Sequence, residues 1–398
     1  MSTIVTIQSL GQRAEGVAEI DGKRIFVPRA LPGERVEIEH DGDRADLLAI
    51  ENASPARIAP FCPHFEQCGG CQTQHMDTGS YQAFKSSLIE TPLQFAGIQT
   101  PVSRFVDAGG DGRRRATLHA RREGSGYMRA RSHQVEPIEH CPILVPALAR
   151  APAMTSAVYQ AIGEADVSFT ATLTGLDVAV RTGKKRANAK ALEPLVARFR
   201  LARLTLNGEM VLQTQPPAVR MGLATVELPS GSFLQATKAA ENFLAEYVIE
   251  ALKGAKNAAD LFCGVGPFAF RLAQSSKVFA ADSDDAAIKA LDQARRLTRG
   301  LKQLTAQRRD LFREEMTRFE LVDFDAVVLD PPRAGAANQV RELAASKVKT
   351  IVMIACDPKT FARDAATLIG GGYKLDNLVA VDQFVHSTHI EIAATFRR

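Results

Sequence analysis

The sequence predicts a multidomain α/β protein whose C-terminal part forms a doubly wound parallel sheet, preceded by a small OB-like β-barrel and a central α+β domain. Its 398 residues exceed the usual length of one domain and suggest two or three. Strand-like and helix-like segments alternate from about residue 230 onward, which is typical of βα units. Short strand-like runs between turn dipeptides fill the first part of the chain. These patterns divide the chain into residues 1–53, 54–229 and 230–398.

The first region, residues 1–53, has the pattern of a closed barrel of short strands. Asp21-Gly22 predicts a hairpin turn, and Leu31-Pro32-Gly33-Glu34 predicts a second turn. The strands are expected at residues 5–7, 16–20, 24–27 and 35–38. OB-type barrels commonly hold single-stranded nucleic acid, so this region is a candidate RNA-binding module.

The second region, residues 54–229, shows weak periodicity, so only a mixed α+β class is predicted, with a helix at residues 81–95. The net charge of +4 is too small to indicate nucleic-acid binding by itself, but the charge is concentrated locally. The dense arginine segment predicts a track for RNA phosphates and comprises Arg113, Arg114, Arg115, Arg121, Arg122, Arg129 and Arg131. A second basic group, at residues 184–186, is interpreted as a solvated loop.

The third region, residues 230–398, alternates strands and helices clearly. The expected strands are residues 257–262, 277–281, 324–329, 350–355, 378–381 and 390–396. The expected helices are residues 267–274, 285–298, 338–345 and 360–369. Repeated βα units form a parallel sheet with a binding crevice at the carboxyl ends of the strands, so the loops that follow these strands are candidate site loops.

The composition is that of an ordinary soluble globular protein, with 45% hydrophobic and 24% charged residues. No apolar run is long enough to span a bilayer, and the first residues lack the charged and hydrophobic segments of a signal peptide. We therefore expect a cytoplasmic protein without a membrane partner, and a monomer.

Four of the six cysteines form a group suited to a metal centre. Cys62, Cys68 and Cys71 follow a C-x5-C-x2-C spacing with two glycines between the last two, and Cys141 comes later. Glycines let the backbone curl so that successive sulfurs approach one centre. Four thiolates suit either an iron-sulfur cluster or tetrahedral zinc, and the spacing does not choose between them.

A cofactor site is predicted where the strand at residues 257–262 ends. Gly264 and Gly266 permit a sharp turn and close approach of a ligand to the backbone, and Pro267 suits a first helical turn. Asp282 ends the next strand, where a carboxylate can accept the hydroxyl groups of a ribose. A complete G-x-G-x-x-G is missing, which favours S-adenosylmethionine over a dinucleotide.

Two further strand ends carry reactive groups. Asp330 precedes two prolines, which form a stiff loop that would hold its carboxylate toward the crevice. Cys356 follows an apolar strand, and Glu391 lies near the start of the last strand. If both side chains open into one cleft, they supply a sulfur nucleophile and a proton acceptor, a pair suited to methylation of a pyrimidine ring carbon.

Taken together, these motifs resemble the bacterial S-adenosylmethionine-dependent RNA (uracil-C5) methyltransferases, closest to the 23S rRNA members with an N-terminal TRAM barrel and an iron-sulfur cluster. The resemblance covers nearly the whole chain and implies a Rossmann-like class I methyltransferase domain after the TRAM barrel and the central domain. It rests on Gly33-Glu34, Cys68-Gly69-Gly70-Cys71, Cys141-Pro142-Ile143-Leu144, Ser232-Phe233-Leu234-Gln235, Asp260 to Gly266, Asp330 to Gly335, Cys356-Asp357-Pro358, and Asp382 to Glu391.

The resemblance implies roles for particular residues. Cys356 looks like the nucleophile, which would add to carbon 6 of uracil, and Glu391 looks like the base that removes the carbon 5 proton. The residues implied around cofactor and uracil are Gln235, Phe262, Gly264, Gly266, Asp282, Asp310 and Asp330. Cys62, Cys68, Cys71 and Cys141 would hold a 4Fe-4S cluster. A reactive thiolate needs an electropositive or hydrogen-bonding pocket, which we expect around Cys356.

The chain also departs from the family pattern. Pro267 stands where the family commonly has Asn, Asp282 replaces Glu, Asp310 replaces Asn, and Thr237 replaces Asn after the Gln235 motif. These changes affect expected cofactor contacts and leave the thiol and the carboxylate intact. The expected activity is methylation of a uridine in 23S rRNA. The alternatives are a tRNA uridine-C5 methyltransferase, an amino methyltransferase acting on adenine or guanine, and a non-catalytic RNA-binding metalloprotein.

Overall fold

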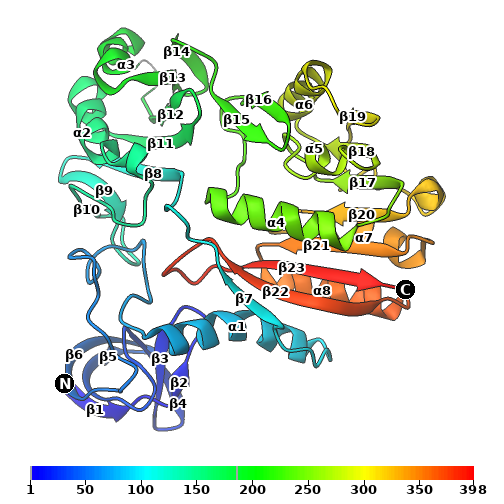
Figure 1. The fold of residues 1–398 in the computed structure, drawn as a ribbon. Coiled ribbons are helices and arrows are strands. Elements are labelled where there is room, and N and C mark those ends of the chain that lie inside the picture. Colours follow the sequence, from blue (N-terminus) through cyan, green and yellow to red (C-terminus); the bar gives the residue numbers. More distant parts are fainter. Residues whose placement is uncertain (1, 185–186) are drawn as a thin grey trace.

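The computed structural model describes residues 2–184 and 187–398, which build three large sheets and one separate hairpin (Figure 1). Lys185 and Arg186 of the second basic group lie outside the described residues. Among the helices of the described ranges, none is long and apolar enough to cross a bilayer.

The N-terminal sheet closes on itself. Its strands are β1 (Ser2–Thr6), β2 (Ser9–Leu10), β3 (Glu15–Ile20), β4 (Lys23–Pro28), β5 (Arg35–Asp41) and β6 (Arg44–Asn52), in the order β1-β5-β6-β4-β3-β2. Because only Ile7 and Gln8 separate β1 at one edge from β2 at the other, the sheet must curl until its edges meet. Alternate apolar side chains such as Ile25, Val27 and Val36 fill its interior. The two strands that were not predicted are β2 and β6.

The central sheet is mixed and has helices on one face. Its strands are β8 (Arg115–Arg121), β9 (Gly124–Met128), β10 (Val135–Pro137), β11 (Ala165–Thr172), β12 (Gly175–Arg181), β13 (Leu201–Leu206) and β14 (Glu209–Gln213), in the order β10-β9-β8-β11-β12-β13-β14. α2 (Ala151–Ile162) and α3 (Glu193–Phe199) pack their buried faces on it. The expected α+β character of this part is confirmed.

The C-terminal sheet is the predicted doubly wound sheet. It comprises β7 (Arg104–Asp107), β17 (Asn257–Leu261), β18 (Lys277–Asp282), β19 (Leu304–Arg308), β20 (Ala326–Leu329), β21 (Thr350–Ala355), β22 (Lys374–Asp382) and β23 (Glu391–Arg397). The order is β19-β18-β17-β20-β21-β23-β22-β7, and β23 runs antiparallel to both of its neighbours. Its central strands are buried apolar runs, as expected when helices cover both faces.

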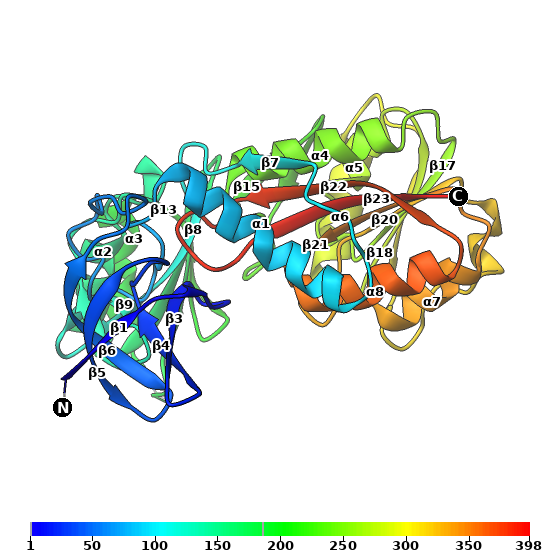
Figure 2. The ribbon, with the colours of Figure 1, turned by 90° about the horizontal axis from the view of Figure 1, so that it is seen from below.

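Helices cover both faces of this sheet, as the view in Figure 2 shows. On one face lie α4 (Lys238–Ala251), α5 (Ala269–Leu272) and α6 (Asp285–Leu297). On the other lie α1 (Thr78–Phe95), α7 (Ala337–Ala345) and α8 (Pro358–Gly370). Asp284 and Asp357 cap α6 and α8 by accepting backbone N–H groups, so each helix starts directly after a strand-end loop.

The middle of the chain does not pack as one unit, in contrast to the expected region 54–229. β7 pairs with β22 in the C-terminal sheet, and α1 packs in the same core as α8. The hairpin of β15 (Ala218–Met221) and β16 (Ala224–Glu227) packs with α6. The chain therefore enters the C-terminal sheet before it builds the central sheet, which weak local periodicity could not reveal.

Candidate active site

The carboxyl ends of the parallel strands meet at one edge of the C-terminal sheet, and the predicted site residues gather there. Phe262 follows β17, Asp282 ends β18, Asp330 follows β20 and Cys356 follows β21. Glu391 begins the antiparallel strand β23, which brings it to the same edge. This edge is where doubly wound sheets bind ligands.

Cys356 and Glu391 occupy facing positions on neighbouring strands. In the antiparallel pair of β21 and β23, Ala355 faces Ile392, so the next facing positions are Cys356 and Glu391. Facing residues of an antiparallel pair direct their side chains to the same side of the sheet. The charge of Glu391 also contributes to the raised pKa of the Cys356 thiol, as expected for close neighbours. The register therefore brings the thiol and the carboxylate close together at this edge of the sheet.

Glu391 is a buried carboxyl group with a strongly shifted pKa. Burial raises its pKa to about 7, against the opposing effects of a hydrogen bond from Gln383 and the positive charge of Arg333. Only 3% of its surface is exposed. A carboxyl group with a pKa near neutrality can exchange a proton under physiological conditions, which is the property of a general base.

The surroundings of Cys356 are more acidic than the expected electropositive or hydrogen-bonding pocket, although Arg333 and a backbone hydrogen bond both lower the pKa of the thiol. Burial, with smaller contributions from the charges of Glu391 and Asp330, raises the pKa of this half-buried thiol to about 11, whereas Arg333 opposes the increase. The pKa of Asp330 itself lies well above its ordinary value because of burial and the nearby carboxyl groups of Glu391, Asp260 and Asp282. Arg333 is thus the cation available to favour a thiolate.

The turn after β17 is sharp, and hydrogen bonds hold the Asp282 carboxylate beside it. The Gly264 N–H donates to Asp282 Oδ2 at 2.9 Å, and the Asp284 N–H donates to Asp282 Oδ1 at 2.9 Å. Gly264 and Gly266 have φ values of 50° and 89°. A Cβ at Gly266 would lie 2.9 Å from Leu291 Cδ1, so a side chain there would clash. Each Asp282 oxygen retains a lone pair for a further donor such as a ribose hydroxyl.

Two further predicted residues border this turn. Phe262 adopts a φ of 64°, and its ring lies 5.4 Å from that of Phe312. Asp310 lies shortly after β19, where its Oδ1 accepts the Phe312 N–H at 3.1 Å, and its side chain is 41% exposed. The pair Phe262–Phe312 joins the two loops. Cys263, between Phe262 and Gly264, is 2% exposed.

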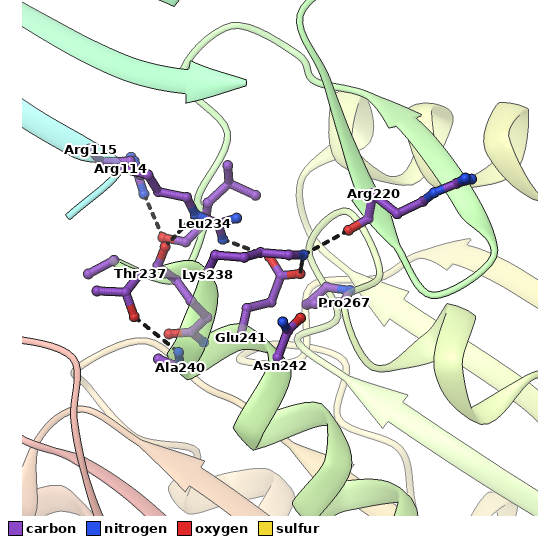
Figure 3. A network of polar contacts seen from close by, with 12 residues as sticks. Arg114, Arg115, Arg220, Leu234, Thr237, Lys238, Ala240, Glu241, Asn242 and Pro267 are labelled. Atoms are coloured by element: carbon purple, nitrogen blue, oxygen red, sulfur yellow. Dashed lines mark hydrogen bonds and ion pairs between the residues drawn. The ribbon is translucent and has the colours of Figure 1, made fainter. Parts of the chain in front are cut away.

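Gln235 is held at the same edge by arginines of the central sheet. Arg114 Nε donates to the Gln235 carbonyl at 3.0 Å, and Arg115 Nη1 donates to the Leu234 carbonyl at 3.0 Å. Figure 3 shows how Arg114 also reaches Glu241 on α4, to which its Nη2 donates at 2.6 Å. Thr237, the replacement for Asn, caps α4 by accepting the Ala240 N–H. The central sheet thus anchors the Gln235 segment.

These contacts revise the predicted phosphate track. Besides Arg114 and Arg115, three of its arginines form ion pairs within the protein: Arg121 with Asp166, Arg129 with Glu136 and Arg131 with Glu15. Much of the arginine segment therefore links elements of the fold. Arg122 is exposed.

The four predicted metal-binding cysteines lie in one neighbourhood. All are half-buried, and Cys62 and Cys141 both influence the pKa values of Cys68 and Cys71. The Gly70 N–H points at Cys68 Sγ over 3.4 Å. Within residues 2–184 and 187–398, however, no group of three or more His, Cys, Asp or Glu side chains is placed to hold a metal ion.

The structure adds residues to which the sequence assigned no role. Gln383 is fully buried, and its Nε2 donates to Glu391 Oε2 at 2.7 Å and to Gln235 Oε1 at 2.6 Å. Lys85 on α1 is also fully buried and donates to carbonyls of the loop before Glu391. In the sequence, Gln383 is one polar residue of a turn segment and Lys85 is one charged residue of a helix. Neither pattern indicates a role in the site.

Comparisons with known proteins agree with this architecture. Residues 179–398 match the family model described as tRNA (Uracil-5-)-methyltransferase. A protein of Brucella suis biovar 1 named as an RNA methyltransferase is 41% identical over 405 residues, covering 99% of this chain and 97% of the relative. The 23S rRNA (uracil(1939)-C(5))-methyltransferase RlmD of Halomonas elongata is 32% identical, covering 97% of this chain and 88% of the relative.

A solved structure shares the fold. The crystal structure of Pyrococcus abyssi tRNA (uracil-54, C5)-methyltransferase in complex with S-adenosyl-L-homocysteine matches with a TM-score of 0.76 and 21% sequence identity, covering 99% of this chain and 100% of that chain. The family model covers more than half of the chain, and the relatives align over almost all of it. This chain therefore belongs to the tRNA (uracil-5-)-methyltransferase family and is an RNA methyltransferase.

Proposed function

We propose that the protein methylates carbon 5 of a uridine in RNA, with Cys356 as the nucleophile and Glu391 as the base. The facing positions of these two residues at the ligand-binding edge carry the proposal. The buried Glu391 carboxyl group, with its pKa of about 7, supports the assignment of the base.

The two side chains have complementary tasks because carbon 5 of uracil is a poor nucleophile. Addition of the Cys356 thiolate to carbon 6 places an electron pair on the carbon 5 side of the ring, as an enolate. S-adenosylmethionine, when bound, would supply its methyl group to carbon 5 as the methyl–sulfur bond breaks, and would leave as S-adenosylhomocysteine. Glu391 then removes the carbon 5 proton, the double bond between carbons 5 and 6 re-forms, and the sulfur leaves as the thiolate. The product is 5-methyluridine.

The residues that would hold S-adenosylmethionine surround the turn after β17. Gly264 leaves open space for a ligand to approach the backbone, Gly266 lets the turn pack against Leu291, and Asp282 offers acceptors for the ribose. Phe262 and Asp310 border this turn, and Asp330 lies beside Glu391 on the substrate side. Gln235, which Gln383 holds by a hydrogen bond, would contact the base.

A cavity beside residues 387–389 is a candidate path for RNA. It measures about 790 Å³ and reaches from the N-terminal sheet to the loop that precedes Glu391. Arg13 and Arg29 of the N-terminal sheet, Arg113, and residues 387–389 contribute to its lining. Cations at both ends suit a phosphate backbone, and a target uridine would be splayed out of the RNA to reach Cys356.

Large-subunit rRNA is the favoured substrate. The relative from Halomonas elongata is named as a 23S rRNA enzyme and aligns over nearly the whole chain, including the closed N-terminal sheet, which we assign to the TRAM class. A tRNA is the alternative, because the family model and the Pyrococcus abyssi structure carry tRNA names.

The cysteine group is proposed to hold a 4Fe-4S cluster. Four thiols lie in one neighbourhood, one of them beside the Gly70 N–H, and thiolates are the ligands that such clusters use. Cys62, Cys68 and Cys71 would supply three of the ligands and Cys141 the fourth.

The decisive experiment uses cellular RNA that contains 5-fluorouridine. Fluorine at carbon 5 prevents proton removal, so a covalent complex between Cys356 and the RNA should accumulate in the presence of S-adenosylmethionine. Sequencing the trapped RNA identifies the target and decides between rRNA and tRNA. Cys356→Ala should abolish both the complex and 5-methyluridine formation, whereas Cys263→Ala should retain them. Trapping that persists in Cys356→Ala would overturn the proposal.

A further inference from the structure

Gln383 makes a set of hydrogen bonds that connects the proposed base to the residue proposed to read the uracil. Its Nε2 donates to Glu391 Oε2 at 2.7 Å and to Gln235 Oε1 at 2.6 Å. Its Oε1 accepts the Ala236 N–H at 2.6 Å. The side chain is fully buried, while Gln235 and Glu391 are each 3% exposed. These contacts use both ends of the Gln383 amide.

The Ala236 N–H determines how every amide in this set is oriented. A backbone N–H can only donate, so Gln383 must present Oε1 to it. The Gln383 Nε2 then faces Gln235, which must answer with its own acceptor, Oε1. The Gln235 Nε2 is consequently turned away from Gln383, and it makes none of the hydrogen bonds found among the described residues. The Gln235 Nε2 is therefore left as a donor that can bond to a further partner.

A donor at this position discriminates between pyrimidines. Uracil carries a carbonyl oxygen at carbon 4, which accepts a hydrogen bond, whereas cytosine carries an amino group, which donates. The Gln235 Nε2 can donate to the carbonyl oxygen of uracil. Opposite the amino group of cytosine, it would face another donor. If the Gln235 amide were free to rotate by 180°, its oxygen would accept from cytosine equally well. Discrimination therefore depends on what holds the amide.

We propose that Gln383 is a positioning residue that locks the Gln235 amide as a donor toward the substrate base, and so selects uracil over cytosine, while it fixes Glu391 beside carbon 5. This inference rests on the proposed function and deepens it. A single buried amide thereby couples base recognition to proton removal.

The frame around Gln383 is anchored from both sides. Arg114 and Arg115 hold the carbonyls of Gln235 and Leu234, so the segment cannot retreat from Gln383. Lys85 donates to the carbonyls of Phe384 and Ser387, which fixes the loop that begins at Gln383. Because the backbone is fixed both at the Gln235 segment and at the loop that begins at Gln383, the Gln383 amide can determine the orientation of the Gln235 amide.

The competing explanation is that Gln383 only satisfies buried backbone groups. Gln339 on α7 is an example of that role, because it is fully buried and its amide bonds both to the N–H and to the carbonyl of Met316. Gln339→Met is therefore the matched control for Gln383→Met. Each variant replaces a fully buried amide with an apolar side chain of similar length.

The test uses the RNA fragment trapped with 5-fluorouridine, transcribed with either U or C at the target. For Gln383→Met we expect kcat on the U fragment to fall about 10- to 100-fold with KM changed less than about threefold, because hydrogen bonds to charged and reacting groups are lost. The preference for U over C, measured as the ratio of 5-methyluridine to 5-methylcytidine rates, should fall by about tenfold or more. Gln339→Met should leave the kinetics and the preference unchanged.

A second variant provides a test that does not depend on whether Gln383→Met folds. Gln235→Glu retains acceptors for the Gln383 Nε2 but has no donor for the base, so it should lose the preference for U to the same degree. Equal kinetics and preference in Gln383→Met and wild type would overturn the inference. So would a loss of rate with an unchanged preference for U in both variants. If wild-type protein traps no 5-fluorouridine RNA at all, the proposed function itself fails.

Discussion

The ammonium group of Lys85 on α1 lies 2.9 Å from Asp382 Oδ1 at the end of β22, and both side chains are buried. The Asp382 carboxylate also accepts a hydrogen bond from the Tyr81 hydroxyl. Lys85 donates in addition to the carbonyls of Phe384, Ser387 and His389. A helix from the N-terminal third of the chain thereby fixes the loop that carries Gln383 and leads to Glu391.

Replacement of Lys85 by Met should destabilise the protein strongly. It leaves the Asp382 carboxylate buried without its cation and the loop carbonyls without a donor, which typically costs about 3–5 kcal/mol. The measurement is the free energy of unfolding from urea titration. Lys289→Met is the control, because its ion pair with Asp285 is on the surface and contributes about 1 kcal/mol or less. Equal effects of the two variants would contradict the structure of this loop.

The sequence predicted the C-terminal sheet well because its signals are local. Buried parallel strands form continuous apolar runs, and the residues that follow them, such as Cys356 and Asp330, are identified by position alone. The predicted helix at residues 267–274 shortens to Ala269–Leu272, since the glycine turn extends further than expected. β19 and α4 were not predicted.

The remaining site residues could not be predicted because their roles depend on contacts between distant segments. Gln383 acquires its partners only when the Gln235 segment folds against it, and Lys85 only when α1 docks on the C-terminal sheet. The arginine segment was predicted to bind RNA phosphates from its charge density. Several of its members, such as Arg114, instead form ion pairs within the protein, which charge density does not reveal.

Glu391 should make both activity and stability depend on pH. Its folded pKa of about 7 lies above the ordinary value of 4.5, so the folded protein binds more protons than the unfolded chain between these values. Stability contributed by the protonated group is therefore present below about pH 4.5 and is lost as the pH rises through 7, by about 3 kcal/mol. Methylation requires the ionised form and should rise over the same range.

The variant Glu391→Gln separates the effect of this carboxyl group on stability from its effect on activity. The variant should lose at least about 100-fold in kcat, yet its unfolding free energy should fall less than that of the wild type between pH 5 and pH 8. The measurements are urea unfolding at both pH values and the pH profile of methylation. A wild-type rate that is flat from pH 5 to pH 8 would exclude this carboxyl group as the base.

Arg333 should promote thiolate formation at Cys356. Its positive charge opposes the effects of burial, Glu391 and Asp330, which together raise the pKa of the thiol to about 11. Arg333→Met should slow trapping of 5-fluorouridine RNA about threefold to tenfold at pH 7, and less at pH 9.5, where thiolate is more abundant. Arg333→Lys should restore part of the rate. An equal loss at both pH values would assign Arg333 to RNA binding instead.

The cysteine group should give freshly purified protein a brown colour. A 4Fe-4S cluster absorbs visible light and contains iron and sulfide, whereas zinc is colourless. Cys68→Ser should lose the absorption and the iron, and Cys263→Ala, which alters a buried thiol of the cofactor turn, should keep both. Colourless protein with stoichiometric zinc would replace the cluster by a tetrahedral site.

Glu241 should control acid stability, because three cations converge on its buried carboxylate. Arg114 and Lys238 each approach it to 2.6 Å and Arg271 to 2.9 Å, and Figure 3 shows the first two pointing at it from opposite sides. Burial alone would raise its pKa, but Arg114 and Lys238 hold the pKa at about 2. Because Arg271 also donates to the Pro267 carbonyl, the carboxylate links the Gln235 segment to the cofactor turn.

Because the pKa of Glu241 is lower in the folded protein than in the unfolded chain, its carboxylate stabilises the fold above about pH 4.5. This contribution disappears as the pH falls toward 2. Glu241→Gln should therefore cost about 3–5 kcal/mol at pH 7, with a smaller difference from wild type near pH 3. Glu320 has a similar pKa of about 2 through Arg309, but its side chain is 44% exposed, so Glu320→Gln should cost about 1 kcal/mol or less. Urea unfolding at the two pH values distinguishes them, and equal costs at pH 7 would show that burial does not strengthen the Glu241 network.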